Sequence, residues 1–245
     1  MKNLLFLLFS LILFSCGENE NDAFVPVPVS NIPVDSSSLQ VPERPLYMLA
    51  LGDSYTIGAS VKMEDRWNEQ LKIQLEQRGY QMNEIKYVAR TGWTTNNLKT
   101  AMRSAALRTK YDMVSLLIGV NNQYQRIDIN VFRREYEELL DSAILYARDD
   151  PKKVIVLSIP DYGYTYSQPS PQITEEINRY NNIKEEITRR KGVVFHDITS
   201  LTRLVRSRPE LIASDGLHPS GELYKLWVNL ISDDVYEQFL APPSN

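Results

Sequence analysis

The chain of 245 residues is 43% hydrophobic and 24% charged, which is the composition of a soluble globular protein. Its formal net charge of −4 comes without a clustered basic excess, and this argues against nucleic acid as a partner. Two histidines and one cysteine are too few to build a zinc site from His and Cys ligands.

The first 45 residues are predicted to lie outside the folded domain. Residues 1–15 contain an apolar run from Leu4 to Phe14, which is short for a membrane span but has the length of a signal-peptide core. The run leads into Cys16, an arrangement that resembles the lipobox of bacterial lipoproteins, in which the cysteine is lipidated. Residues 16–45 are rich in proline and serine, which favours an extended tether. We therefore expect an exported lipoprotein anchored at the periplasmic face or cell surface, with an ordinary secretory signal as the alternative.

Residues 46–240 alternate between short apolar runs and helical patterns, and residues 241–245 form a C-terminal tail. Strands are predicted at 46–52, 84–90, 112–119, 153–160 and 193–199. Helices are predicted at 66–79, 94–108, 131–149, 173–192 and 220–239. Because helices separate the strands, the strands must run parallel in a sheet that is covered on both faces. The pattern predicts one three-layer α/β/α domain of the doubly wound type, in which ligands bind at the carboxyl ends of the strands.

A lone serine stands at the end of the first predicted strand. Ser54 follows Gly52 and Asp53 in a turn, where it is either a helix cap or a nucleophile held at the edge of the sheet. The flanking residues fit neither the G-x-S-x-G elbow of ordinary α/β-hydrolases nor the G-x-G-x-x-G loop of dinucleotide-binding proteins. Taken alone, the turn favours the helix cap.

Four further residues either supply what a serine nucleophile needs or are ordinary turn residues. Asp215 and His218 precede the last predicted helix, and such a pair can provide a general base and the carboxylate that orients it. Gly92 and Asn121 follow the second and third strands, where a backbone N–H and a side-chain amide can stabilise a carbonyl oxygen that becomes negative. The other histidine, His196, lies inside the fifth predicted strand, which favours a packed structural role.

These motifs together resemble a known family. The segments GDSYTIG (52–58), RTGW (90–93), GVNN (119–122) and DGLHP (215–219) occur in the order and rough spacing of the four signature blocks of SGNH/GDSL hydrolases. The resemblance covers residues 46–240. One block departs from the family pattern, because Asn122 stands where the family usually has aspartate.

The resemblance implies the flavodoxin-like fold of that family and a role for each residue. Ser54 would be the nucleophile, His218 its general base and Asp215 the residue that orients the base. The backbone N–H groups of Ser54 and Gly92, with the Asn121 side chain, would form the oxyanion hole. No metal or organic cofactor is needed for this chemistry.

Aromatic residues near the predicted site suggest a substrate. Tyr162, Tyr164 and Tyr166 follow the fourth strand, and Trp93 adjoins Gly92, so these rings either wall the site or pack on their own domain. We expect a monomeric esterase that removes short acyl groups, acetyl above all, from a small-molecule or polysaccharide ester. A lysophospholipase, thioesterase or acyltransferase with the same residues is one alternative. A surface lipoprotein that binds glycans without catalysis is the alternative from another class.

Overall fold

The computed structural model describes residues 44–240, with side chains up to residue 238. The predicted signal segment, Cys16, almost all of the tether and the tail at 241–245 lie outside the described residues. The described part contains one sheet, in which every paired strand runs parallel in the order β2-β1-β3-β4-β5. Its strands are β1 (Met48–Gly52), β2 (Lys86–Ala89), β3 (Met113–Leu117), β4 (Val154–Leu157) and β5 (Val194–His196). This is a doubly wound order that reverses between β1 and β3, and the predicted fold class is confirmed.

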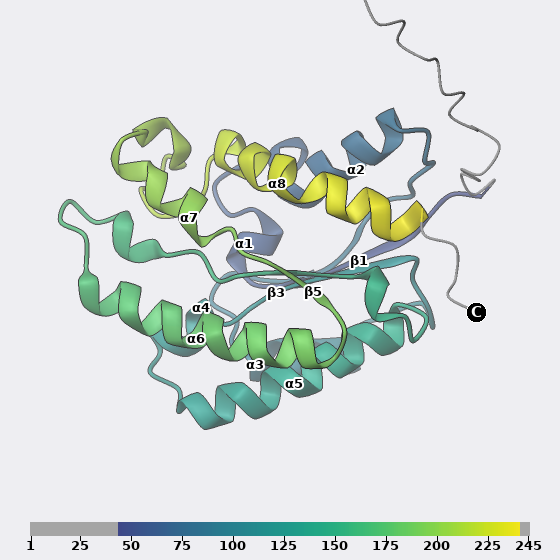
Figure 1. Cartoon of the computed structure of the whole chain (residues 1–245), viewed down its shortest axis with the longest axis horizontal. Coiled ribbons are helices and arrows are strands. Elements are labelled where there is room, and N and C mark those ends of the chain that lie inside the picture. The colour runs from purple at the N-terminus through teal and green to yellow at the C-terminus, as the bar shows by residue number, and fades with distance from the viewer. Residues whose placement is uncertain (1–43, 241–245) are drawn as a thin grey trace, which may run out of the picture. The chain divides into compact units, whose positions relative to one another are not determined.

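Helices cover both faces of this sheet, which makes three layers (Figure 1). One face carries α2 (Trp67–Gln77) and α8 (Gly221–Leu240), which pack against each other. The other carries α3 (Thr95–Ser104), α5 (Ile129–Tyr146) and α6 (Pro171–Arg190). Three short helices, α1 (Ser54–Ile57), α4 (Val120–Tyr124) and α7 (Thr199–Thr202), lie toward the same end of the sheet, at the left in Figure 1. Between residues 44 and 240, none of the helices combines the length and the apolar character that crossing a membrane requires.

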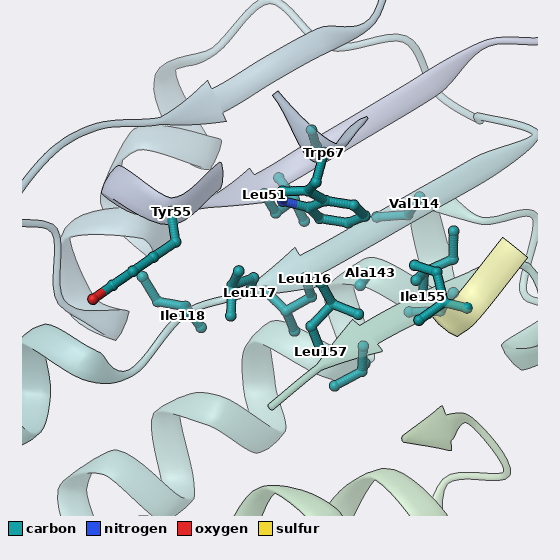
Figure 2. Close-up of a cluster of buried hydrophobic side chains, with 14 of the residues drawn as sticks. Leu51, Tyr55, Trp67, Val114, Leu116, Leu117, Ile118, Ala143, Ile155 and Leu157 are labelled. Carbon is teal, nitrogen blue, oxygen red and sulfur yellow. The ribbon is translucent and has the colours of Figure 1, made fainter. Parts of the chain in front are cut away.

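The core lies on both sides of the central strands. Every residue of β1, β3 and β4 is buried, as parallel strands between two helical layers must be. Figure 2 shows Leu51 and Trp67 above this sheet layer and Leu157 below it. Burial of each such aliphatic or aromatic side chain contributes about 1.5–3 kcal/mol. The central strands are therefore a rigid base for the loops at their carboxyl ends.

The structure corrects two predicted boundaries and adds the three short helices α1, α4 and α7. The fifth strand ends at His196, because Asp197 accepts a hydrogen bond from the Thr199 backbone N–H at 2.8 Å and turns the chain into α7. The helix predicted at 94–108 ends at Ser104. The Ser104 hydroxyl donates a hydrogen bond to the Ala101 carbonyl, and such side-chain bonds compete with the backbone hydrogen bonds of a helix. Helices α1, α4 and α7 were not predicted, since four or five residues are too few for a helical period. All other predicted boundaries agree to within three residues.

Candidate active site

The turn after β1 places Ser54 at the carboxyl edge of the sheet. Asp53, not Ser54, caps α1, because its carboxylate accepts the Tyr55 backbone N–H at 3.0 Å. A Cβ on Gly52 would lie 2.1 Å from the Thr56 hydroxyl oxygen, so only glycine allows this turn to close. Ser54 is thereby left without a capping role, at the first residue of α1 and at the wall of a pocket.

Asp215 and His218 form a tight pair in the loop before α8. The His218 Nδ1 atom lies 2.6 Å from an Asp215 carboxylate oxygen. The other oxygen accepts the backbone N–H groups of Leu217 and His218, each at 2.9 Å. Ser60 donates its hydroxyl to the same carboxylate at 2.6 Å. This serine was not predicted from the sequence.

These contacts keep Asp215 ionised and set the tautomer of a neutral His218 ring. Burial alone would raise the pKa of Asp215, but the hydrogen bonds from Ser60, His218 and Leu217 outweigh it and hold this pKa well below its usual range. An ionised carboxylate can only accept, so the neutral His218 ring carries its hydrogen on Nδ1 and leaves Nε2 as an acceptor. The ring also packs on Tyr55, with 5.3 Å between the ring centroids.

Candidate oxyanion donors come from the ends of β2 and β3. Gly92 has a φ of +82°, and a Cβ there would meet no atom within 4 Å, so its backbone borders open space. Asn121 lies in the first turn of α4 and donates one amide hydrogen to the Trp93 carbonyl at 3.0 Å. Because an amide carries two hydrogens, the second is available to a ligand.

These groups meet around one pocket of about 270 Å³, which we call the catalytic pocket. Ser54, Gly92, Asn121 and His218 all line it. No hydrogen bond joins the side chains of Ser54 and His218 in the part of the chain that the structure describes. Contacts of this kind are often loose without substrate and tighten in the complex.

Asn122 has a structural role behind this pocket. Its side chain is fully buried; it accepts the Thr95 backbone N–H at 2.9 Å and donates to the Thr95 hydroxyl at 2.7 Å. That hydroxyl donates in turn to Glu135 at 2.5 Å. Because an aspartate could not donate, the amide suits this chain of hydrogen bonds, which ties α4 to the start of α3.

The predicted aromatic wall is present in part. Tyr162 and Tyr166 line the catalytic pocket, and Tyr124, which was not predicted, lines it beside them. Trp93 and Tyr164 do not line it. Trp93 is partly buried against the core, and Tyr164 lies under Arg203 with 5.7 Å between the guanidinium carbon and the ring centroid.

His196 lies away from the catalytic pocket, at the end of β5. Its ring is buried, with Nδ1 3.6 Å from a carboxylate oxygen of Asp234 on α8. Burial lowers its pKa, and the charge of Asp234 opposes that shift only in part. These contacts fit the structural role expected from its place within a strand.

A buried charge lies beneath the site. Lys184 of α6 is fully buried. Its amino group donates to the carbonyl of Leu157, the last residue of β4, at 2.8 Å, and to the carbonyl of Ile118, the residue after β3, at 3.1 Å. Burial lowers its pKa to about 7, with the charge of Asp53 opposing that shift. Burial likewise raises the pKa of Asp53 to about 7. The Lys184 amino group thus bridges two strand ends, and its charge interacts with that of Asp53 in the turn that holds Ser54.

We expect Lys184→Met to lower the free energy of unfolding by about 2–4 kcal/mol near pH 8, because two buried carbonyls lose their donor at about 1–3 kcal/mol each. Between pH 7 and 10.5 the folded state binds fewer protons at Lys184 than the unfolded chain does. The stability contributed by this lysine therefore rises with pH through that window and is lost as pH falls through 7. Urea unfolding of both proteins across the window measures the difference, and the exposed Lys225→Met is the control. A difference that does not grow with pH would contradict the assignment.

The described residues contain no group of three or more His, Cys, Asp and Glu side chains that could hold a metal ion.

A serine at a strand end, a His–Asp pair and amide donors around one pocket are the arrangement of serine hydrolases on a three-layer α/β/α fold. Residues 50–226 match the model of the GDSL-like lipase/acylhydrolase family, and the chain belongs to this family.

Known relatives agree with this assignment. Over 138 residues the chain is 26% identical to an acetylxylan esterase of Geobacillus stearothermophilus, a match that covers 53% of this chain and 62% of that relative. The crystal structure of Axe2, an acetylxylan esterase from the same organism, superposes with a TM-score of 0.58 at 19% identity, covering 78% of this chain and 94% of Axe2. The esterase EstA from Pseudoalteromonas sp. superposes with a TM-score of 0.57 at 13% identity, covering 78% and 97%. The structural matches establish the fold.

Proposed function

We propose that the protein is a serine esterase that cleaves carboxylic esters through an acyl-enzyme, with acetyl esters of carbohydrate as its substrates. The observation that carries this proposal is the convergence of Ser54, His218, Gly92 and Asn121 on one small pocket, with Asp215 behind His218. A hydrolase of this kind needs a nucleophile, a base, an orienting carboxylate and oxyanion donors, and each is present.

The geometry supports a two-step reaction. The Ser54 oxygen attacks the ester carbonyl while His218 Nε2 accepts its proton, and the ionised Asp215 stabilises the imidazolium that forms. The backbone N–H groups of Ser54 and Gly92, with the second Asn121 amide hydrogen, stabilise the tetrahedral oxyanion. His218 then protonates the leaving alcohol. Water, deprotonated by His218, attacks the acyl-enzyme and releases the acid and free Ser54.

Two observations support acetyl esters in particular. The catalytic pocket measures about 270 Å³, and tyrosine rings form much of its wall, which suits a short acyl group and a sugar better than a fatty chain. The curated relative is an acetylxylan esterase.

We expect the highest kcat/KM for p-nitrophenyl acetate in a series of esters from acetate to palmitate. Each methylene that a site buries stabilises the bound chain by about 0.8 kcal/mol, so an enzyme for lipids would show rates that climb with chain length. Acetate release from acetylated xylan extends the test to a polysaccharide. A maximum at ten carbons or more would favour a lysophospholipase or thioesterase instead.

We further propose that the protein is an exported lipoprotein attached to the membrane through Cys16. The support is the sequence alone, in which the only cysteine stands one residue beyond the apolar run, after Ser15. We expect Cys16→Ala to move the protein from the membrane fraction to the soluble or unprocessed pool, as measured by fractionation and gel migration. Unchanged membrane recovery would contradict lipidation.

A further inference from the structure

A second, larger hollow of about 670 Å³ adjoins the catalytic pocket. It lies between α4, the loop after β4 and the first half of α6, and we call it the α4–α6 groove. Tyr124, Tyr162 and Tyr166 line both the groove and the catalytic pocket, so the two spaces share one wall. A substrate whose ester carbon lies at Ser54 can therefore extend into the groove past these three rings. None of the catalytic residues uses this space.

The shared wall is an aromatic surface held in place by its own contacts. The ring of Tyr162 lies edge-on to those of Tyr124 and Tyr166, with 6.2 Å between the centroids in each pair. The Tyr162 hydroxyl donates to Gln123 at 2.8 Å. Tyr124 is 67% exposed, so its ring is available to a ligand. Rings of this kind offer a flat amphipathic surface to the faces of sugars.

The charges of the groove point to the kind of sugar. Its single carboxylate, Glu176, is already occupied, since it accepts the side chains of Gln123 at 2.6 Å and Gln172 at 2.9 Å. Arg126 and Arg179 also line the groove, and neither forms an ion pair within 4 Å with any residue in the range 44–240. Besides the hydrogen bonds from the two glutamines, the charges of Arg126 and Arg179 both lower the pKa of Glu176, so this carboxylate offsets them in part. Two arginines and one glutamate leave the groove with a net charge of +1, on a chain whose net charge is −4. A guanidinium is a strong partner for a carboxylate, which it can bind through two parallel hydrogen bonds.

We propose that the α4–α6 groove binds the sugar chain of the substrate, and that Arg126 and Arg179 select acidic sugars, namely uronates, near the acetylated position. The tyrosine wall stacks on the sugar rings, and the arginines bind the uronate carboxylate. This inference rests on the proposed esterase function, which it refines to esters of acidic polysaccharides.

The test compares two acetylated xylo-oligosaccharides of equal length, one with a glucuronate branch and one without. We expect the wild-type kcat/KM to be about tenfold or more higher for the acidic substrate, and this preference to weaken as salt is added. The double variant Arg126→Gln/Arg179→Gln should lose the preference. Arg134→Gln, which changes an exposed arginine of α5 away from the groove, should keep it.

A binding measurement separates the groove from catalysis. Calorimetry on the inactive Ser54→Ala protein should show tighter binding of unacetylated oligogalacturonate than of a neutral xylo-oligosaccharide of the same length. Equal kcat/KM for the two acetylated substrates would overturn the proposal, as would equal binding of the acidic and the neutral oligosaccharide. If wild-type protein failed to cleave p-nitrophenyl acetate as well, the esterase assignment itself would fail, whereas cleavage without a preference would overturn only the role of the groove.

Discussion

Ser54→Ala is expected to lower kcat/KM for p-nitrophenyl acetate by about 10³-fold or more, to the background left by the oxyanion donors. The reason is that, in the proposed mechanism, the acyl-enzyme forms on the Ser54 oxygen, and Ser54 is the only serine among the described residues that line the catalytic pocket. The same change should abolish labelling by a fluorophosphonate probe, which intact mass measures directly. One mass addition on the wild-type protein and none on the variant is the expected result.

The control is Ser142→Ala, which removes the hydroxyl of a half-buried serine on α5 that donates to the carbonyl of Glu138. It should leave labelling and activity unchanged, and urea unfolding should show that both variants are folded. A labelled and active Ser54→Ala protein would remove Ser54 from the role of nucleophile. A wild-type protein that neither reacts with the probe nor cleaves esters would favour the glycan-binding alternative.

The layers of the fold could be predicted because each element has a local signal. Strands β1 and β3 are short runs buried on both faces, and α5 and α6 have long helical periods, so parallel crossovers follow. The boundaries of β5 and α3 were harder to predict, because a side chain ends each element. The Asp197 carboxylate accepts the Thr199 backbone N–H, and the Ser104 hydroxyl donates to the Ala101 carbonyl. Such contacts leave no periodic signal in the sequence.

The site was predictable where its residues follow strand ends or stand close together in the sequence, as Asp215 and His218 do. Ser54, Gly92 and Asn121 could be placed together, since the carboxyl ends of parallel strands meet at one edge. Ser60 contacts Asp215 across 155 residues of sequence, and no spacing rule connects the two. Tyr124 lies on a helix too short to be predicted, so its place beside Tyr162 depended on the three-dimensional structure.

The two histidines allow a second test with opposite expectations. We expect His218→Ala to lower kcat/KM by about 10³-fold or more, and His196→Ala to keep most of the activity. His218 lines the catalytic pocket with its Nδ1 bonded to Asp215, which leaves Nε2 to accept the Ser54 proton. His196 lies at the end of β5, where its nearest charged partner is Asp234 on the outer helix α8.

Stability has to be separated from catalysis in this comparison. The exposed fraction of His196 is only 5%, so His196→Ala leaves a cavity. We expect this cavity to lower the free energy of unfolding by about 1–3 kcal/mol. His218→Ala removes a ring at the pocket wall and should cost less stability. Activity is therefore compared at a temperature where urea unfolding shows both variants to be folded. The ranking by stability should then be the reverse of the ranking by activity. His196→Ala should be the less stable protein and the more active one. A His196→Ala protein that is folded but inactive, beside an active His218→Ala protein, would move the general base from the loop before α8 to β5.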